Sequence, residues 1–137
     1  MENPGFLSLG AFTITAAGTQ TSDWTAADLN GLLSMAAQVR LAYGSGGTSI
    51  KVYLQTSLDQ GTTAIDIACA AFTTASGVKA LNFSALTPKT TAVTPTDGTL
   101  TDDTAVDGIL GDRFRLKVVS VGTYAASTVL TAGIVAR

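Results

Sequence analysis

The polar side chains best suited to chemistry stand together in residues 55–67 (QTSLDQGTTAIDI), which form either a ligand site or a hairpin that holds its shape. The sequence contains no histidine, which removes the commonest general base and the Ser–His and Cys–His nucleophile pairs. Two carboxylates can replace them, as in glycoside hydrolysis. However, the single glutamate is Glu2, and the aspartates fall mostly in loops, with Asp66 expected to face outward from a strand. We therefore predict no catalytic residue, no cofactor and a protein that is not an enzyme.

Within this stretch, the pattern Ser57-x-Asp59-x-Gly61-x-Thr63 resembles the Asp-box hairpin. The residue types suit a turn, because the Asp59 carboxylate can accept backbone N–H groups and Gly61 can adopt a positive φ. Ser57 and Thr63 can tie the two arms together. The pattern departs from the family at Ala64, where the family has Trp or Phe. The resemblance implies a structural turn that occurs on unrelated β folds, with a ligand site as the alternative.

A second polar region is acidic and holds five of the ten acidic residues: Asp97, Asp102, Asp103, Asp107 and Asp112. Loop carboxylates and carbonyls are the ligands that calcium prefers, but the spacing does not fit an EF-hand loop. We expect a solvated, turn-rich loop and assign no metal site, with a bound cation as the alternative.

Two segments are predicted to contact a partner. One is a strand with three cations on one face, which can pair with the acidic loop or with an acidic partner surface. The other is an apolar N-terminal arm, residues 1–10, which can add to the sheet edge of a neighbour. The residues concerned are Arg113, Arg115 and Lys117 in the strand, and Phe6, Leu7 and Leu9 in the arm. Trp24 is expected to anchor the core, with stacking on a sugar as the alternative, and Cys69 to be a buried thiol.

Composition narrows the class of protein. A chain of 137 residues fits one domain, residues 1–137, and charged residues make up only 13%, about half the usual share. A surface covered by Thr, Ser, Ala and Gly suits a protein that packs against neighbours, or a rigid β protein. A net charge of −2 and a pI near 4.7 argue against nucleic-acid binding. No apolar run is long enough to span a bilayer, and MENPGFLSLG lacks the features of a secretory signal.

The elements expected to position these residues are mostly strands. Apolar residues at every second position from Met35 to Tyr43 predict a half-buried strand, and similar alternation marks residues 6–15, 50–55, 64–73, 78–84, 113–118 and 129–135. One helical turn is plausible within residues 21–33, and residues 87–108 are expected to form a long loop. Seven or eight short strands with Gly-rich turns predict an all-β protein, an antiparallel β-sandwich of the jelly-roll or Ig-like kind.

Four stretches, residues 52–67, 70–88, 101–118 and 121–137, resemble in texture the small β-sandwich structural proteins of tailed-bacteriophage virions, especially head decoration (cement) and accessory proteins. The resemblance implies a non-enzymatic virion protein, made in the host cytoplasm, that binds the major capsid protein or other virion proteins. It also implies a homo-oligomer, with a trimer favoured. Two alternatives stay open: a tail, baseplate or fibre component, and a carbohydrate-binding sandwich that contacts the host surface.

Overall fold

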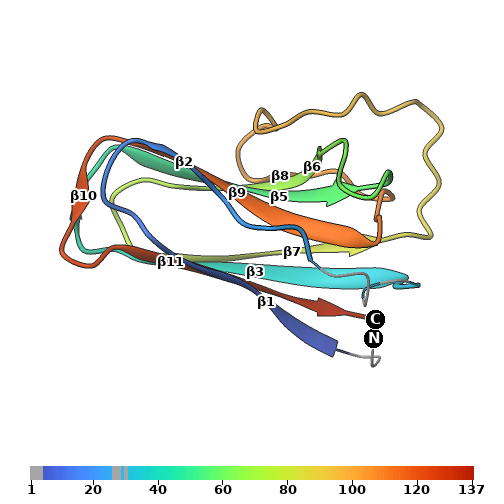
Figure 1. Ribbon diagram of the computed structural model, residues 1–137, viewed down its shortest axis with the longest axis horizontal. Coiled ribbons are helices and arrows are strands. Elements are labelled where there is room, and N and C mark those ends of the chain that lie inside the picture. The colour runs from blue at the N-terminus through green and yellow to red at the C-terminus, as the bar shows by residue number, and fades with distance from the viewer. Residues whose placement is uncertain (1–4, 26–28, 30) are drawn as a thin grey trace.

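The computed structural model describes residues 5–25, 29 and 31–137 and consists of two β-sheets packed face to face (Figure 1). Sheet A contains, in spatial order, β1 (Gly5–Thr13), β11 (Val129–Ala136), β3 (Ser34–Ala42) and β7 (Gly77–Ser84). Sheet B contains β2 (Gly18–Thr21), β9 (Arg113–Val121), β5 (Ser49–Ser57), β6 (Ile65–Phe72) and β8 (Thr104–Ala105). A small ribbon pairs β10 (Tyr124–Ala125) with β4 (Ser45–Gly46).

The strand order decides between the two predicted sandwich topologies. Three of the eleven described strands, β4, β8 and β10, have only two residues each. Without them, eight longer strands remain. Sheet A then takes the first, last, third and sixth of these, and sheet B the second, seventh, fourth and fifth, with all neighbours antiparallel. This order is that of a jelly roll. The predicted all-β antiparallel sandwich is confirmed.

Alternation of side chains explains why the strands form two layers. In β3, every second side chain is buried against sheet B, while those between are mostly exposed; the buried ones are Met35, Ala37, Val39 and Leu41. β9 and β11 alternate in the same way. Because side chains on a strand point to opposite faces in turn, each sheet contributes one apolar face to a common core.

The predicted extended arm is wrong for the residues that the structure describes. Residues 5–10 belong to β1, an edge strand that pairs with β11 over its whole length, with a shift of register between Ser8 and Gly10. Leu9 is buried in the core and Leu7 packs against it, so burial of these side chains holds the segment on its own sheet. Residues 1–4 lie outside the described part of the chain.

The segment after β2 continues along the edge of β9 and carries Trp24. The backbone N–H of Ser22 donates to Leu116 O, and that of Thr25 donates to Phe114 O, both at 2.9 Å. The hydroxyls of Ser22 and Thr25 accept the return bonds from the same two β9 residues. Most of the expected helical turn, at 26–28 and 30, lies outside the described residues; Leu29 has a 3₁₀ conformation.

Candidate functional site

The hairpin between β5 and β6 is closed by its own side chains. The Ser57 hydroxyl donates to Asp59 Oδ1 at 2.8 Å and accepts the N–H of Gly61 at 2.8 Å. Asp59 Oδ1 also accepts the N–H of Thr63 at 2.7 Å. Hydrogen bonds from Thr63, and then from Ser57, hold the pKa of Asp59 below its usual value. The four motif residues are therefore linked by hydrogen bonds within the turn, and these bonds close the loop.

Trp24 supplies the aromatic ring that position 64 lacks. A Cβ added to Gly61 would lie 3.0 Å from Trp24 Cδ1, so the indole touches the hairpin at its glycine. The guanidinium carbon of Arg115 lies 4.4 Å from the centroid of the same ring, a cation–π distance. The aromatic partner of this turn thus comes from a segment more than thirty residues earlier in the chain.

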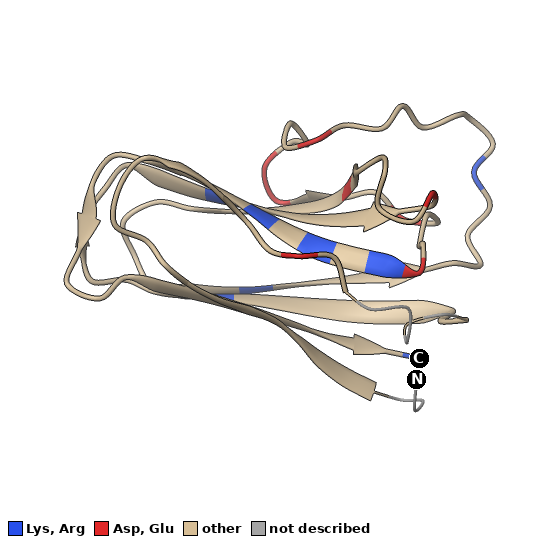
Figure 2. Ribbon diagram, viewed as in Figure 1, with Lys and Arg blue, Asp and Glu red and all other residues tan. Residues whose placement is uncertain are grey.

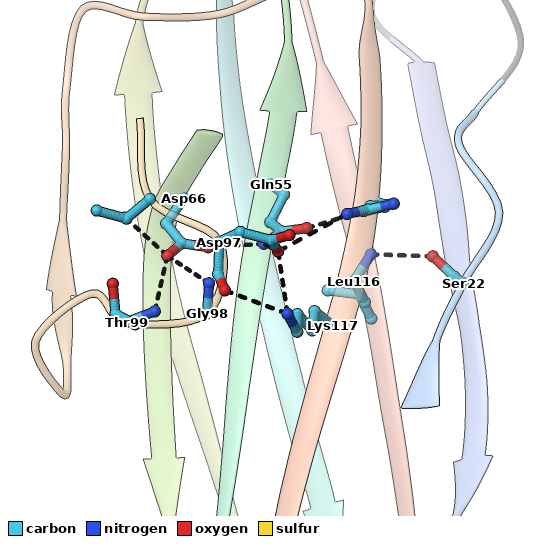
Figure 3. Close-up of polar contacts among 10 residues, drawn as sticks. Ser22, Gln55, Asp66, Asp97, Gly98, Thr99, Leu116 and Lys117 are labelled. Carbon is cyan, nitrogen blue, oxygen red and sulfur yellow. Dashed lines mark hydrogen bonds and ion pairs between the residues drawn. The ribbon is translucent and has the colours of Figure 1, made fainter. Parts of the chain in front are cut away.

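A buried polar network fixes the long loop after β7 to the outer side of sheet B (Figure 3). Gln55 is fully buried, and its Nε2 donates to Asp66 Oδ1 at 2.8 Å and to Asp97 Oδ1 at 2.7 Å. Asp66 Oδ2 accepts Thr96 Oγ1 at 2.8 Å. It also accepts the backbone N–H groups of Gly98 at 2.8 Å and Thr99 at 3.0 Å.

The basic face of β9 completes this network instead of standing free. Arg115 Nε donates to Gln55 Oε1 at 2.8 Å, and Lys117 Nζ lies 3.1 Å from both Asp97 O and Asp97 Oδ1. Both side chains are about four-fifths buried, at 20% and 22% exposure. Arg113 Nε is buried without a hydrogen-bond partner among the described residues. Since Arg115 and Lys117 already bind the loop, we place the proposed partner contact elsewhere.

Three of the four remaining acidic residues of the loop, Asp102, Asp103 and Asp107, each hold a different part of the molecule, and the Asp112 carboxylate makes no bond to the described residues. Asp102 pairs with Lys51 at 3.0 Å and Asp103 with Lys79 at 2.7 Å. Asp107 accepts the N–H groups of Ser84 and Gly108. Within the described ranges, no group of three His, Cys, Asp or Glu side chains is placed to hold a metal ion. Beneath this loop Cys69 is buried, and burial with the nearby Asp102 raises the pKa of its thiol to about 11.

These bonds predict a loss of stability in acid. Lys79 and the Ala71 amide hold the pKa of Asp103 below its usual value, and Gln55 and Lys117 do the same for Asp97. A carboxylate whose pKa is lower in the folded than in the unfolded chain stabilises the fold above the unfolded pKa. That contribution is lost as the pH falls through the folded pKa. We expect the urea midpoint to be flat from roughly pH 5 to 7 and to fall below about pH 4.

Urea unfolding followed by circular dichroism across this pH range measures the effect. Asp103→Asn should reduce the acid-dependent fall, because it removes one of the contributing carboxylates. A native midpoint that stays constant down to about pH 2.5 would contradict the assignment.

The outer face of sheet A carries much less charge than the outer face of sheet B. Its side chains are small or uncharged, and Arg40 is the one charged residue among those at outward-facing positions: Phe6, Ser8, Ala11, Ala36, Gln38, Arg40, Ala42, Val78, Ala80, Asn82, Thr131, Gly133 and Val135. Figure 2 shows the acidic residues of the described ranges, and most of the basic ones, on the other sheet and its flanking segments. We call this set the sheet A face.

Phe6 forms one wall of a shallow hollow in the sheet A face. It is 73% exposed, yet its ring lies over Gly133, where an added Cβ would be 2.7 Å from Phe6 Cε2. The hollow has a volume of about 290 Å³, with Gln38 and Arg40 on its opposite side. Arg40 forms no ion pair with any described residue.

The structure separates the six residues predicted to contact a partner. Phe6 lies on the sheet A face, whereas Leu7 and Leu9 point into the core, and the three cations of β9 lie on the outer side of sheet B. The sheet A face was not predicted from the sequence as a contact surface. Its signal was present in residues 36–42, where the exposed positions between buried ones carry only one charge.

The aromatic side chains of the described residues do not form a pair of exposed rings on one face. Phe6 is the one exposed aromatic among the described residues, and Tyr53 and Tyr124 are buried. Tyr43 is half-buried and donates to Gly46 O, and Trp24 is engaged by the hairpin and Arg115.

Comparison of the chain with protein-family models and with curated proteins gave no match. Within the described part of the chain, no helix has the length and apolar character needed to cross a membrane.

Proposed function

We propose that the chain is a non-enzymatic structural protein of a tailed-phage virion, a decoration (cement) protein that binds the capsid and stabilises the head. The observation that carries this proposal is the sheet A face: a four-stranded surface of mostly small, uncharged side chains with one charge, and no described strand pairs over it. Jelly rolls serve both capsid and lectin domains, so the fold alone does not choose a function.

The composition of the sheet A face favours protein contact. Protein–protein interfaces are depleted of charged residues at their centre, and such depletion avoids the cost of burying unpaired charges. Ser and Ala are also less common in interfaces than on the rest of the surface, so the lack of charge is the feature of this face that favours contact. Small side chains such as Ala36 and Ala80 let a partner approach the sheet closely. Phe6, at 73% exposure, offers an aromatic anchor of the kind that dominates binding energy.

The size of the face favours repeated binding. Four strands about 4.8 Å apart and eight residues long span a projected area of roughly 500 Å². This is the scale of one standard interface, which buries about 800 Å² of accessible surface per partner. A contact of this size gains strength when several copies bind one lattice together. This supports the homo-oligomer that we propose for the bound form; the preference for a trimer comes from the resemblance to virion decoration proteins.

The test is co-sedimentation with undecorated heads, and separately with tails, of the phage whose genome encodes the chain. We expect saturable binding to heads, with Ala36→Glu at least roughly tenfold weaker because it buries an unpaired charge. Ala92→Glu is the matched control, because the same change falls on the exposed loop over sheet B. Binding to tails only would favour a tail component instead. Equal binding by the two variants would exclude the sheet A face.

A further inference from the structure

The two sheets have four edge strands, β1, β7, β2 and β8, and β7 is the one that is both long and regular. β2 has four residues and β8 has two, and the pairing of β1 shifts between Ser8 and Gly10. β7 pairs with β3 over eight consecutive residues, from Gly77 to Ser84, with no shift. Short strands and bulges are devices that protect an edge from pairing with another chain. β7 has neither.

The outward backbone groups of β7 can be assigned from its ends. The N–H of Ala85 donates to Leu33 O at 2.7 Å, which continues the hydrogen-bonded series with β3. Residues directly opposite in antiparallel strands alternate between hydrogen-bonded and non-hydrogen-bonded pairs. The backbone N–H and C=O groups of the even-numbered residues of β7 therefore point away from β3. Ser84 N–H accordingly donates to Asp107 Oδ1 at 2.7 Å. The outward groups of Val78, Ala80 and Asn82 form no hydrogen bond with the described residues.

A place for one more strand lies beside this edge. Sheet B continues one strand beyond β6, to β8, whereas no described strand pairs with the outer edge of β7. A hollow of about 330 Å³ lies between β6, β7 and the residue before β8; its lining is Cys69, Ala70, Lys79, Ala80, Leu81 and Asp103. The charge of Lys79 does not bar entry, since its ammonium is bound by Asp103 at 2.7 Å and by Ala71 O.

We infer that β7 accepts an extended segment of a partner protein as an additional strand of sheet A. Val78, Ala80 and Asn82 supply the backbone donors and acceptors, and main-chain bonds of this kind give affinity for a docked strand. The side chain opposite Leu81 points into the hollow and is small and apolar. A single segment fits better than the β7 edge of a second copy, because each copy's β8 would project over the shared boundary. The inference does not depend on the virion proposal.

The probe is an acetylated, amidated nine-residue peptide of alternating threonine and valine, with alanine at the centre and lysine at each end. It is titrated into the isotope-labelled full chain, and backbone amides are followed by NMR and hydrogen exchange. We expect saturable shifts on β7 and on residues 101–105. The amides of Val78, Ala80 and Asn82 should exchange at least roughly tenfold more slowly in the complex. The same peptide with alternate amides N-methylated should not bind, because its edge donors are removed.

Ala80→Pro removes one outward donor that the fold does not use, and proline is tolerated at such edge positions. It should weaken peptide binding about tenfold or more, while Ala80→Ser, which keeps the N–H, should bind like the native chain. Three results would overturn the inference. The two peptides could bind equally well, or the shifts could be confined to the sheet A face. The third is protection of β7 that appears without peptide as the concentration of the chain rises. The N-methylated peptide decides the matter on the native chain even if the proline variant unfolds.

Discussion

Asp66→Ala is expected to lower the free energy of unfolding by about 3–5 kcal/mol. Asp66 is 2% exposed and accepts four hydrogen bonds, from Gln55, Thr96, Gly98 and Thr99. Its removal leaves the backbone N–H groups of Gly98 and Thr99 without an acceptor and takes one of the two acceptors of the buried Gln55 amide, which keeps Asp97. An unsatisfied buried group costs about 1–3 kcal/mol, so the sum is large even if the loop partly rearranges.

Urea unfolding measures this loss, and hydrogen exchange locates it. The amides of Gly98 and Thr99 should lose protection first, because Asp66 is their acceptor. Asp23→Ala is the control: Asp23 is exposed, and its carboxylate bonds to no described residue. A loss below about 1 kcal/mol, or unchanged exchange at the two amides, would show that the loop is held by other contacts.

The fold was predictable because its information is local. Every second residue from Met35 to Leu41 is apolar and buried, and the same period recurs in the other long strands. Residues 6–15 were predicted as a strand and residues 1–10 also as an arm, because Leu7 and Leu9 are spaced like any short apolar run and do not indicate a neighbouring strand. Only the presence of β11 as a neighbour, more than a hundred residues away, turns that run into an edge strand.

The buried network was not predictable from spacing. Asp66 was expected to face outward from its strand, and it does lie on the outer side of sheet B opposite Gln55. Its burial depends on a loop that returns some thirty residues later to place Thr96, Gly98 and Thr99 over it. No periodic pattern in the sequence predicts that a distant loop will cover a strand in this way. Trp24 poses the same difficulty, since its contact with Gly61 joins two irregular segments.

The two outer faces of the sandwich therefore have different roles. On sheet B, loop carboxylates, lysines and Arg115 satisfy one another, and that side is closed by the chain itself. On sheet A, the face is uncharged except for Arg40, and the edge at β7 has open backbone groups. Both surfaces that we propose for contact with other proteins therefore lie on sheet A.

Trp24→Ala is expected to lower the free energy of unfolding by about 2–3 kcal/mol, less than a fully buried tryptophan would, because the ring is half-buried. The loss combines its contact with Gly61 and its stacking under Arg115. Trp24→Phe keeps an aromatic ring and should recover more than half of the loss. Urea unfolding by circular dichroism gives each value. Combined with Ser57→Ala, the loss should be less than additive, because both changes loosen one hairpin. Strict additivity would mean that Trp24 stabilises the β9 edge alone and that the turn holds its shape without it.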